Sequence, residues 1–287
     1  MTASLSTSLL LPIALGIIMF GLGLSLTVAD FTRVLRFPKA VIVGLAAQML
    51  LLPPVCLLIA HLFGLGPSLA VGLMLLAASP GGAVANLYSH LAHGDVALNI
   101  TLTAVNSVLT VVTLPLIVNL SMLHFMGAGE ALPLQFTKIM QVFVIVLGPV
   151  LAGMLVNRRA ELFAARLRGP LKLISLILLV LVVGVAVLQN RDSIGGYIQV
   201  VGAACLAFNL VSLAVGYGIP RLLKLEHGQA VAIGMEVGIH NASLAIMVAM
   251  SPLLLNDAEM AVPAAVYGVL MFFTAAGFGW LVGRRPA

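Results

Sequence analysis

The chain has 287 residues, of which 62% are hydrophobic and 8% charged, and its mean hydropathy is +1.19. A soluble domain carries roughly 25% charged residues, so this composition excludes a water-soluble fold and predicts an all-α polytopic membrane protein. The net charge of +5 does not indicate nucleic-acid binding, because the basic residues are spread over short loops between apolar runs.

Nine apolar runs are long enough to cross the bilayer as helices, which takes about 20 residues each. The N-terminal run lacks the basic region of a signal peptide, so we expect it to remain as a span. The connections are short, and no obligate protein partner is evident. The expected spans are 7–28, 39–61, 68–93, 96–123, 136–156, 170–189, 196–221, 228–252 and 260–283.

The lysines and arginines of the loops predict the orientation of the chain. With nine spans, twelve of the fourteen basic residues fall on one side, and only Lys138 and Arg191 fall on the other. Cytoplasmic loops carry the excess of Lys and Arg. We therefore expect a multi-pass protein of the inner (plasma) membrane with its N-terminus outside and its C-terminus in the cytoplasm.

Two spans contain residues that interrupt a helix. In the third, Pro80 cannot donate a backbone hydrogen bond, and the two glycines that follow destabilise a helix. The eighth contains the sequence GMEVGIHN at 234–241. We expect Asn86 to lie in the first break and Glu236, His240 and Asn241 in the second. Broken helices at matching places in two halves indicate a transporter site built from inverted repeats, here spans 1–4 and 6–9.

Glu236 is the residue of the eighth span whose transfer into the bilayer costs the most free energy. An ionised carboxylate at the bilayer centre costs at least a few kcal/mol, so something must offset its charge. No Lys or Arg is expected at membrane depth in this chain. A bound cation or a proton is therefore favoured over an ion pair.

Other polar residues fall inside the expected spans. Asn99, Thr103, Asn106 and Thr110 follow a 4, 3, 4 spacing and share one face of a helix. Interhelical hydrogen bonding alone is an equal alternative for this stripe, and it is the favoured role for Gln48. Sodium prefers oxygen ligands, and an unwound helix also frees carbonyls. A sodium site could be built from Glu236 together with Gln48, Asn86, Asn99 and Thr103.

The segments SPGGAVANLYSHLAHGDVALNITLTAV and GMEVGIHNASLA resemble the two crossing-helix motifs of the bile acid:sodium symporter family. GIIMFGLGLSLTVADF and VGLAAQMLLLPP resemble the early helices of that family. The resemblance implies two discontinuous helices that cross at mid-membrane in a core domain, packed against a smaller panel. The implied core covers about 39–123 and 196–283, and the implied panel covers about 7–28 and 136–189.

The resemblance also implies two sodium sites behind the crossing and a substrate cavity beside it. The first sodium site would use Asn86, Asn99, Thr103 and Glu236. The second would use Gln48, Glu236, the carbonyls of Val237 and Ile239, and the side chain at position 240. The substrate-binding residues would be Asn241, Gly82, Ala83 and His240.

Three residues differ from the usual pattern of that family. Ala85 stands where a serine is usual, and Asn99, also in place of serine, still offers an oxygen. His240 replaces glutamine, and a neutral imidazole, which titrates near neutral pH, is a poor ligand for sodium. The number of sodium ions is therefore one or two, and His240 could replace the second by a proton or a fixed charge.

These observations predict a secondary active transporter, not an enzyme, that couples sodium to the symport of a small organic anion by alternating access. The alternative is a proton-coupled or one-sodium carrier of the same fold. A metalloid efflux permease is less favoured because neither broken helix contains a cysteine. A membrane sensor would need a soluble signalling extension, and we expect none here. An intramembrane enzyme would need a nucleophile or metal motif, and the sequence contains neither Gly-x-Ser-x-Gly nor His-Glu-x-x-His. The sequence does not name the substrate.

Overall fold

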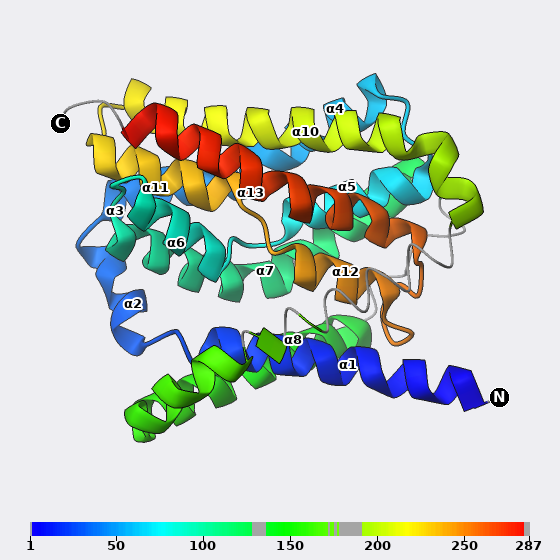
Figure 1. The fold of residues 1–287 in the computed structure, drawn as a ribbon, viewed down its shortest axis with the longest axis horizontal. Coiled ribbons are helices and arrows are strands. Elements are labelled where there is room, and N and C mark those ends of the chain that lie inside the picture. The colour runs from blue at the N-terminus through cyan, green and yellow to red at the C-terminus, as the bar shows by residue number, and fades with distance from the viewer. Residues whose placement is uncertain (1, 128–135, 172, 175–176, 178–190, 284–287) are drawn as a thin grey trace.

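A computed structural model describes residues 2–127, 136–171, 173–174, 177 and 191–283, and the regular structure within these ranges is entirely helical (Figure 1). The α-helices are α1 Thr2–Gly23, α2 Val28–Thr32, α3 Pro38–Ala46, α4 Leu52–Leu62, α5 Pro67–Ala78, α6 Ala83–Leu91, α7 Val96–Phe125, α8 Phe136–Arg159, α10 Arg191–Leu222, α11 His227–Gly238, α12 Ala242–Met250 and α13 Val262–Gly283. Between them lie two short 3-10 turns, η1 Arg33–Leu35 and η3 Glu259–Ala261, and one π-helical turn, η2 Ala47–Leu51. Residues 161–171 are also helical.

Five segments of the described chain are long and apolar enough to cross a membrane, and a bent pair at the N-terminus makes a possible sixth. The chain is thus a multi-pass membrane protein, as its composition predicts. The expected span at 170–189 falls largely outside the described residues, so the count of nine stays a prediction. The five segments are Pro38–Leu62, Val96–Phe125, Gln199–Leu222, His227–Met250 and Glu259–Gly283.

The first expected span, 7–28, differs from the observed helix. Helix α1 ends at Gly23, and the chain then turns by 69° into Val28–Leu35. The expected third span, 68–93, consists of two short helices, α5 and α6, which confirms the predicted interruption at Pro80 and the two glycines after it. The turn after Gly23 was not predicted, although it too follows a residue that disfavours a continuous helix.

The two interrupted spans meet at their breaks. Residues 79–82 separate α5 from α6, and residues 239–241 separate α11 from α12. The backbone N–H of Asn241 donates to the Pro80 carbonyl at 2.8 Å, while α6 packs on α11 and α5 on α12. The expectation that Asn86 and Glu236 lie inside the breaks is wrong, because Asn86 lies in α6 and Glu236 in the last turn of α11.

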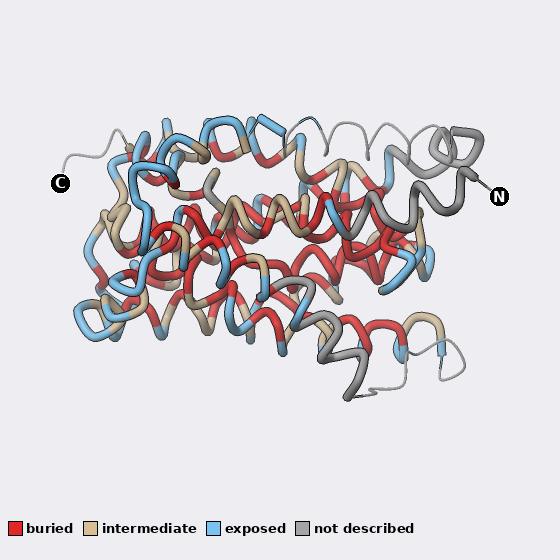
Figure 2. The backbone as a smooth tube through the Cα atoms, turned by 90° about the horizontal axis from the view of Figure 1, so that it is seen from below, coloured by how far each residue is buried: buried red, intermediate tan, exposed pale blue. Residues whose placement is uncertain are grey.

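The broken helices form the centre of the molecule. Every residue of α5 from Leu69 to Ala78 is buried, and so is every residue of α11 from Ala230 to Gly238. A helix that is apolar on all sides is buried in a protein core or in lipid, and here neighbouring helices of the protein bury these two. Figure 2 shows the buried backbone running through the interior of the bundle. Helices α1 and α8 pack on each other along one side, opposite α10 and α13 (Figure 1).

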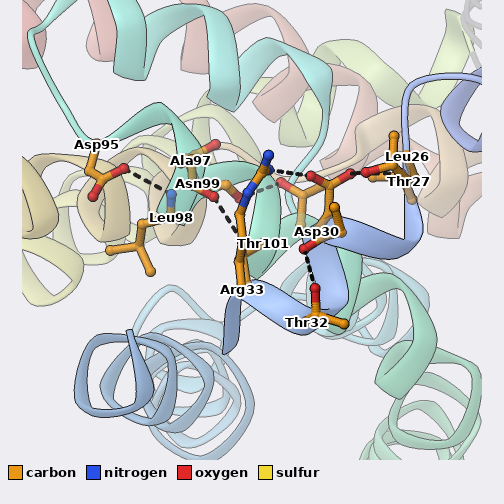
Figure 3. A network of polar contacts seen from close by, with 12 residues as sticks. Leu26, Thr27, Asp30, Thr32, Arg33, Asp95, Ala97, Leu98, Asn99 and Thr101 are labelled. Carbon is orange, nitrogen blue, oxygen red and sulfur yellow. Dashed lines mark hydrogen bonds and ion pairs between the residues drawn. The ribbon is translucent and has the colours of Figure 1, made fainter. Parts of the chain in front are cut away.

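The bend between α1 and α2 is fixed on both of its sides. On the α2 side, the Asp30 carboxylate accepts hydrogen bonds from the Thr27 N–H at 2.7 Å and the Thr27 hydroxyl at 2.8 Å. Asp30 also pairs with Arg33, beside the first turns of α7 (Figure 3). A carboxylate at a helix N-terminus satisfies free backbone donors and is favoured by the helix dipole.

On the α1 side, two polar residues from the neighbouring segment hold the linker carbonyls. Asn157 Nδ2 donates to the Leu26 carbonyl at 3.0 Å, and Arg168 Nε donates to the Leu24 carbonyl at 2.9 Å. Arg168 Nη2 also donates to Asn157 Oδ1 at 2.8 Å, so the two residues act together. The linker is thus tied to α8 and the segment that follows it.

Candidate functional site

The Glu236 carboxylate lies at the centre of the bundle, where its side chain is 1% exposed. The Thr103 hydroxyl donates to Oε2 at 2.6 Å, and Asn106 Nδ2 donates to Oε1 at 3.2 Å. Both donors stand on α7, three residues apart along its polar stripe, so one face of that helix supports the carboxylate. The first break packs on the same group, because a Cβ atom at Gly81 would overlap the Glu236 carboxylate.

Three amide oxygens of the same region are buried without a hydrogen-bond partner among the described residues. They are the Oδ1 atoms of Asn86, Asn99 and Asn106. The other end of the Asn99 amide is fixed, because Nδ2 donates to the Ala232 carbonyl at 2.7 Å. A buried acceptor without a partner costs free energy, so an ordered water or an ion is expected to contact these atoms. Carboxylate and amide oxygens are the donor set of a hard cation.

A second polar cluster lies on the other side of the first break. Gln48 Nε2 donates to the Ser79 carbonyl at 3.1 Å and lies 3.3 Å from His240 Nδ1. His240 Nδ1 is itself 3.2 Å from the Ser79 carbonyl. Gln48 stands in the π-helical turn η2, a distortion that is frequent at functional sites. The Gln48 amide, the His240 ring and the Ser79 carbonyl are therefore all within hydrogen-bond distance of one another.

Aromatic rings fix the orientation of His240. Its ring stacks on Phe208, with centroids 5.5 Å apart and planes 17° apart, and meets the edge of Tyr267 at 5.4 Å. The imidazole is 1% exposed, and no described residue hydrogen-bonds to its Nε2. His240 thus contacts Gln48 and the Ser79 carbonyl, although the next residue in the chain, Asn241, is half-exposed.

The second break changes the bonding of the backbone around it. In a continuous helix the Asn241 N–H would bond to the Val237 carbonyl, but here it bonds to Pro80 and releases that carbonyl from the bond. The Gly238 carbonyl instead accepts from Asn209 Nδ2 at 2.9 Å and from the Tyr267 hydroxyl at 2.8 Å. Ile239, in the break itself, is buried.

The other expected substrate residues lie at the half-exposed edges of the breaks. Gly82 and Asn241 are both partly exposed, and a Cβ atom at Gly82 would meet nothing within 4 Å. Asn241 Oδ1 accepts the Leu244 N–H at 3.0 Å and so caps α12. Ala83 opens α6, but its side chain lies outside the described part of the structure.

Sequence reasoning missed several residues that contact these groups. Asn106 belongs to the expected stripe, and its spacing of three from Thr103 is the signal that could have placed it beside Glu236. Gly81 was identified only as a helix breaker. Asn209 and Tyr267 reach the Gly238 carbonyl from α10 and α13, and no sequence spacing connects those helices to the break.

Comparison with known proteins identifies the family of this chain. Residues 12–196 match the sequence model of the Sodium Bile acid symporter family. The chain belongs to this family. It is therefore a member of a transporter family, as its motifs predict, and not of an enzyme family.

Relatives from bacteria and plants cover most of the chain. It is 33% identical over 264 residues to the uncharacterized sodium-dependent transporter YocS of Bacillus subtilis, covering 90% of this chain and 78% of the relative. It is 30% identical over 259 residues to a probable chloroplastic sodium/metabolite cotransporter of Arabidopsis thaliana, covering 90% of this chain and 62% of the relative. The P3 protein of Bos taurus is 30% identical over 212 residues, which are 74% of this chain and 44% of that protein.

Proposed function

We propose that this protein is a sodium-coupled symporter that carries a small organic anion across the membrane by alternating access. The observation that carries the proposal is the Glu236 carboxylate, buried where two broken helices meet and surrounded by uncharged oxygen-bearing side chains. The names of the relatives, a sodium-dependent transporter and a sodium/metabolite cotransporter, support the choice of ion and of a metabolite as substrate.

Sodium is a co-transported substrate in this proposal, and the Glu236 region is its binding site. The carboxylate would balance the charge of the ion. The unpartnered oxygens of Asn86, Asn99 and Asn106 and the Thr103 hydroxyl would supply neutral ligands. Because the ligands come from α6, α7 and α11, binding would draw the two broken helices together. That gives the ion a direct effect on the shape of the substrate cavity.

The Gln48 cluster favours one sodium ion over two. Gln48 directs its amide nitrogen, not its oxygen, toward the Ser79 carbonyl and His240. Gln48 Oε1 is buried without a partner among the described residues, but the imidazole of His240 beside it is a poor ligand for sodium. In this proposal His240 takes the place of a second cation and joins the breaks by hydrogen bonds, so the carbonyls of Val237 and Ile239 need not bind an ion.

The anionic substrate would bind at the partly exposed edge of the breaks, near Gly82, Ala83 and Asn241. Helices α6 and α12 both begin there, with Gly82 and Asn241 as their respective N-cap residues. The N-terminal ends of half-helices in the membrane carry partial positive charge and attract an anionic group. This offers the substrate an electrostatic partner without a buried arginine.

The finer architecture belongs to the same proposal. Nine spans, arranged as inverted repeats with two discontinuous crossing helices, would place the N-terminus outside and the C-terminus in the cytoplasm. The panel would contain α1 and α8, which pack on each other along one side of the molecule (Figure 1). The core would contain the broken helices and their neighbours, and its movement against the panel would alternate access.

The sodium site can be tested without knowing the substrate. The purified protein is heated in NaCl and in KCl of equal ionic strength, and the unfolding temperature is measured. Sodium that binds only the folded state raises this temperature. We expect a sodium-specific rise for the wild type and none for Glu236→Gln, because the neutral amide no longer balances the ion.

Glu226→Gln is the matched control, since Glu226 precedes the same helix and is exposed. It should keep the full sodium response. A full sodium response in Glu236→Gln would refute the assignment of the ion to this carboxylate. For wild-type protein, a sodium dependence that fits two cooperative ions would contradict the one-sodium reading.

A further inference from the structure

Two histidines face each other at the ends of two spans, away from the Glu236 region. His61 lies one residue before the end of α4, and His124 lies one residue before the end of α7. Both side chains are exposed, and their Nε2 atoms are 3.1 Å apart. The rings meet edge to face at a centroid distance of 5.0 Å, and Phe125 packs near both.

The hydrogen bond on the other side of His61 sets its tautomer. His61 Nδ1 is 2.9 Å from the Leu57 carbonyl. A carbonyl only accepts hydrogen bonds, so in the neutral ring Nδ1 carries the proton and Nε2 presents its lone pair to His124. Metal-binding histidines commonly donate their second ring N–H to a carbonyl in this way, which fixes the ring and raises its basicity.

The separation of the two nitrogens matches that of neighbouring ligands on one metal ion. Zinc–nitrogen bonds are about 2.0–2.1 Å, which puts two ligands about 3.3 Å apart at a tetrahedral angle and about 2.9 Å apart at a right angle. The observed 3.1 Å lies between these values. In the ion-free protein the same distance is that of a hydrogen bond, in which the His124 Nε2–H donates to the lone pair of His61 Nε2. An ion would replace this hydrogen bond once the His124 proton has moved to Nδ1, and Phe125 packs near both rings.

We propose that His61 and His124 bind one divalent first-row transition metal ion of the zinc, nickel and copper class. Imidazole nitrogen suits these ions and is a poor ligand for sodium, so the site is distinct from that at Glu236. Within the described chain no third His, Cys, Asp or Glu joins the pair to make a group of three. Water completes the coordination, and the ion joins the ends of α4 and α7.

The test uses wild-type protein purified in detergent, with any histidine tag removed. Zinc binding is measured by calorimetry, and Cu²⁺ is added separately to record the nitrogen couplings in its electron paramagnetic resonance spectrum. We expect one zinc per chain and a Cu²⁺ spectrum with two equivalent nitrogens. His61→Ala and His124→Ala should each weaken zinc binding by about tenfold or more, as changes around metal ligands commonly do.

His90→Gln is the matched control, because His90 is exposed on α6 and should not alter zinc binding. The unfolding temperature without metal verifies that the two alanine variants fold. Unchanged zinc affinity in both of them would overturn the proposal, and so would wild-type binding that appears only at millimolar zinc. The sodium response is measured on the same samples, so a failure here is separate from a failure of the proposed transport function.

Discussion

Two adjacent glycines at the first break have different roles. Gly81 packs on the Glu236 carboxylate, whereas Gly82 is partly exposed and borders open space. Neither has a positive φ angle, and Gly82 has an extended backbone that any residue can adopt. The need for glycine is therefore one of space at position 81, and the structure shows no such need at position 82.

Alanine at each position separates these roles. We expect Gly81→Ala to lower stability by about 1–3 kcal/mol, as overpacked cores do, and to remove the sodium-specific rise in unfolding temperature. Gly82→Ala should fold normally and keep that rise. Unfolding temperatures in NaCl and KCl provide the measurement. Equal effects of the two changes would contradict the contact between Gly81 and Glu236.

At the scale of elements, the breaks are stabilised by groups on helices distant in the sequence. The Gly238 carbonyl, at the end of α11, accepts from Asn209 of α10 and Tyr267 of α13. Carbonyls at a helix end lack partners within the helix and must find them elsewhere. The break thus depends on the positions of two neighbouring helices.

Removing these donors one at a time should show that dependence. Tyr267→Phe is expected to cost about 1 kcal/mol, because Asn209 still satisfies the carbonyl. Adding Asn209→Leu should cost more than the sum of the two single changes, because the carbonyl is then buried without a partner. A double-mutant cycle of unfolding free energies measures the coupling, and strict additivity would argue against a shared acceptor.

The linker between α1 and α2 is held by hydrogen bonds at both of its ends. Arg168 and Asn157 hold its first half, and Asp30 holds its second half beside α7. If the core moves against the panel, this linker must bend between its two anchors. Residues that absorb such motion lie at the ends of elements.

Arg168→Ala releases one anchor without touching the ion site. We expect a changed rate of exchange between inward- and outward-open states, followed by spin labels on α1 and α7, with the sodium response unchanged. Arg166→Ala, on the exposed side of the same segment, is the control and should alter neither. Loss of the sodium response in Arg168→Ala would show that the linker and the ion site are not separable.

At the scale of the whole molecule, the proposed orientation in the membrane rests on the loop charges and can be tested directly. The native cysteines, Cys56 and Cys205, are buried, so they should contribute little background to surface labelling. Leu35 is 86% exposed and Leu253 is 56% exposed. Leu35 is the last residue of the bent pair at the N-terminus, and Leu253 lies between His227–Met250 and Glu259–Gly283. The proposed orientation places Leu35 on the cytoplasmic side and Leu253 on the outer side.

Single cysteines at these positions report the orientation. In intact cells a membrane-impermeant maleimide should label Leu253→Cys and not Leu35→Cys. After the membrane is opened, both should react. Labelling of Leu35→Cys alone in intact cells would reverse the proposed topology.

Much of this architecture could be predicted from the sequence because lipid imposes a simple rule. Helices that cross the bilayer need long apolar runs, so five of the expected spans agree with described segments to within a few residues. Pro80 and the glycines beside it mark the first break for an equally local reason. The bend at Gly23 was not predicted, because the apolar run continues through it.

The sequence alone determined the class of protein, the existence of two breaks and the chemical type of the residues near Glu236, since these depend on composition and local backbone chemistry. Only the tertiary structure decided which groups touch. Asn106 and Thr103 donate hydrogen bonds to the Glu236 carboxylate. Gln48 contacts His240 and the Ser79 carbonyl. Asn209 and Tyr267 donate to the Gly238 carbonyl. Such pairings depend on how separate helices pack, and no spacing within a single helix records that arrangement.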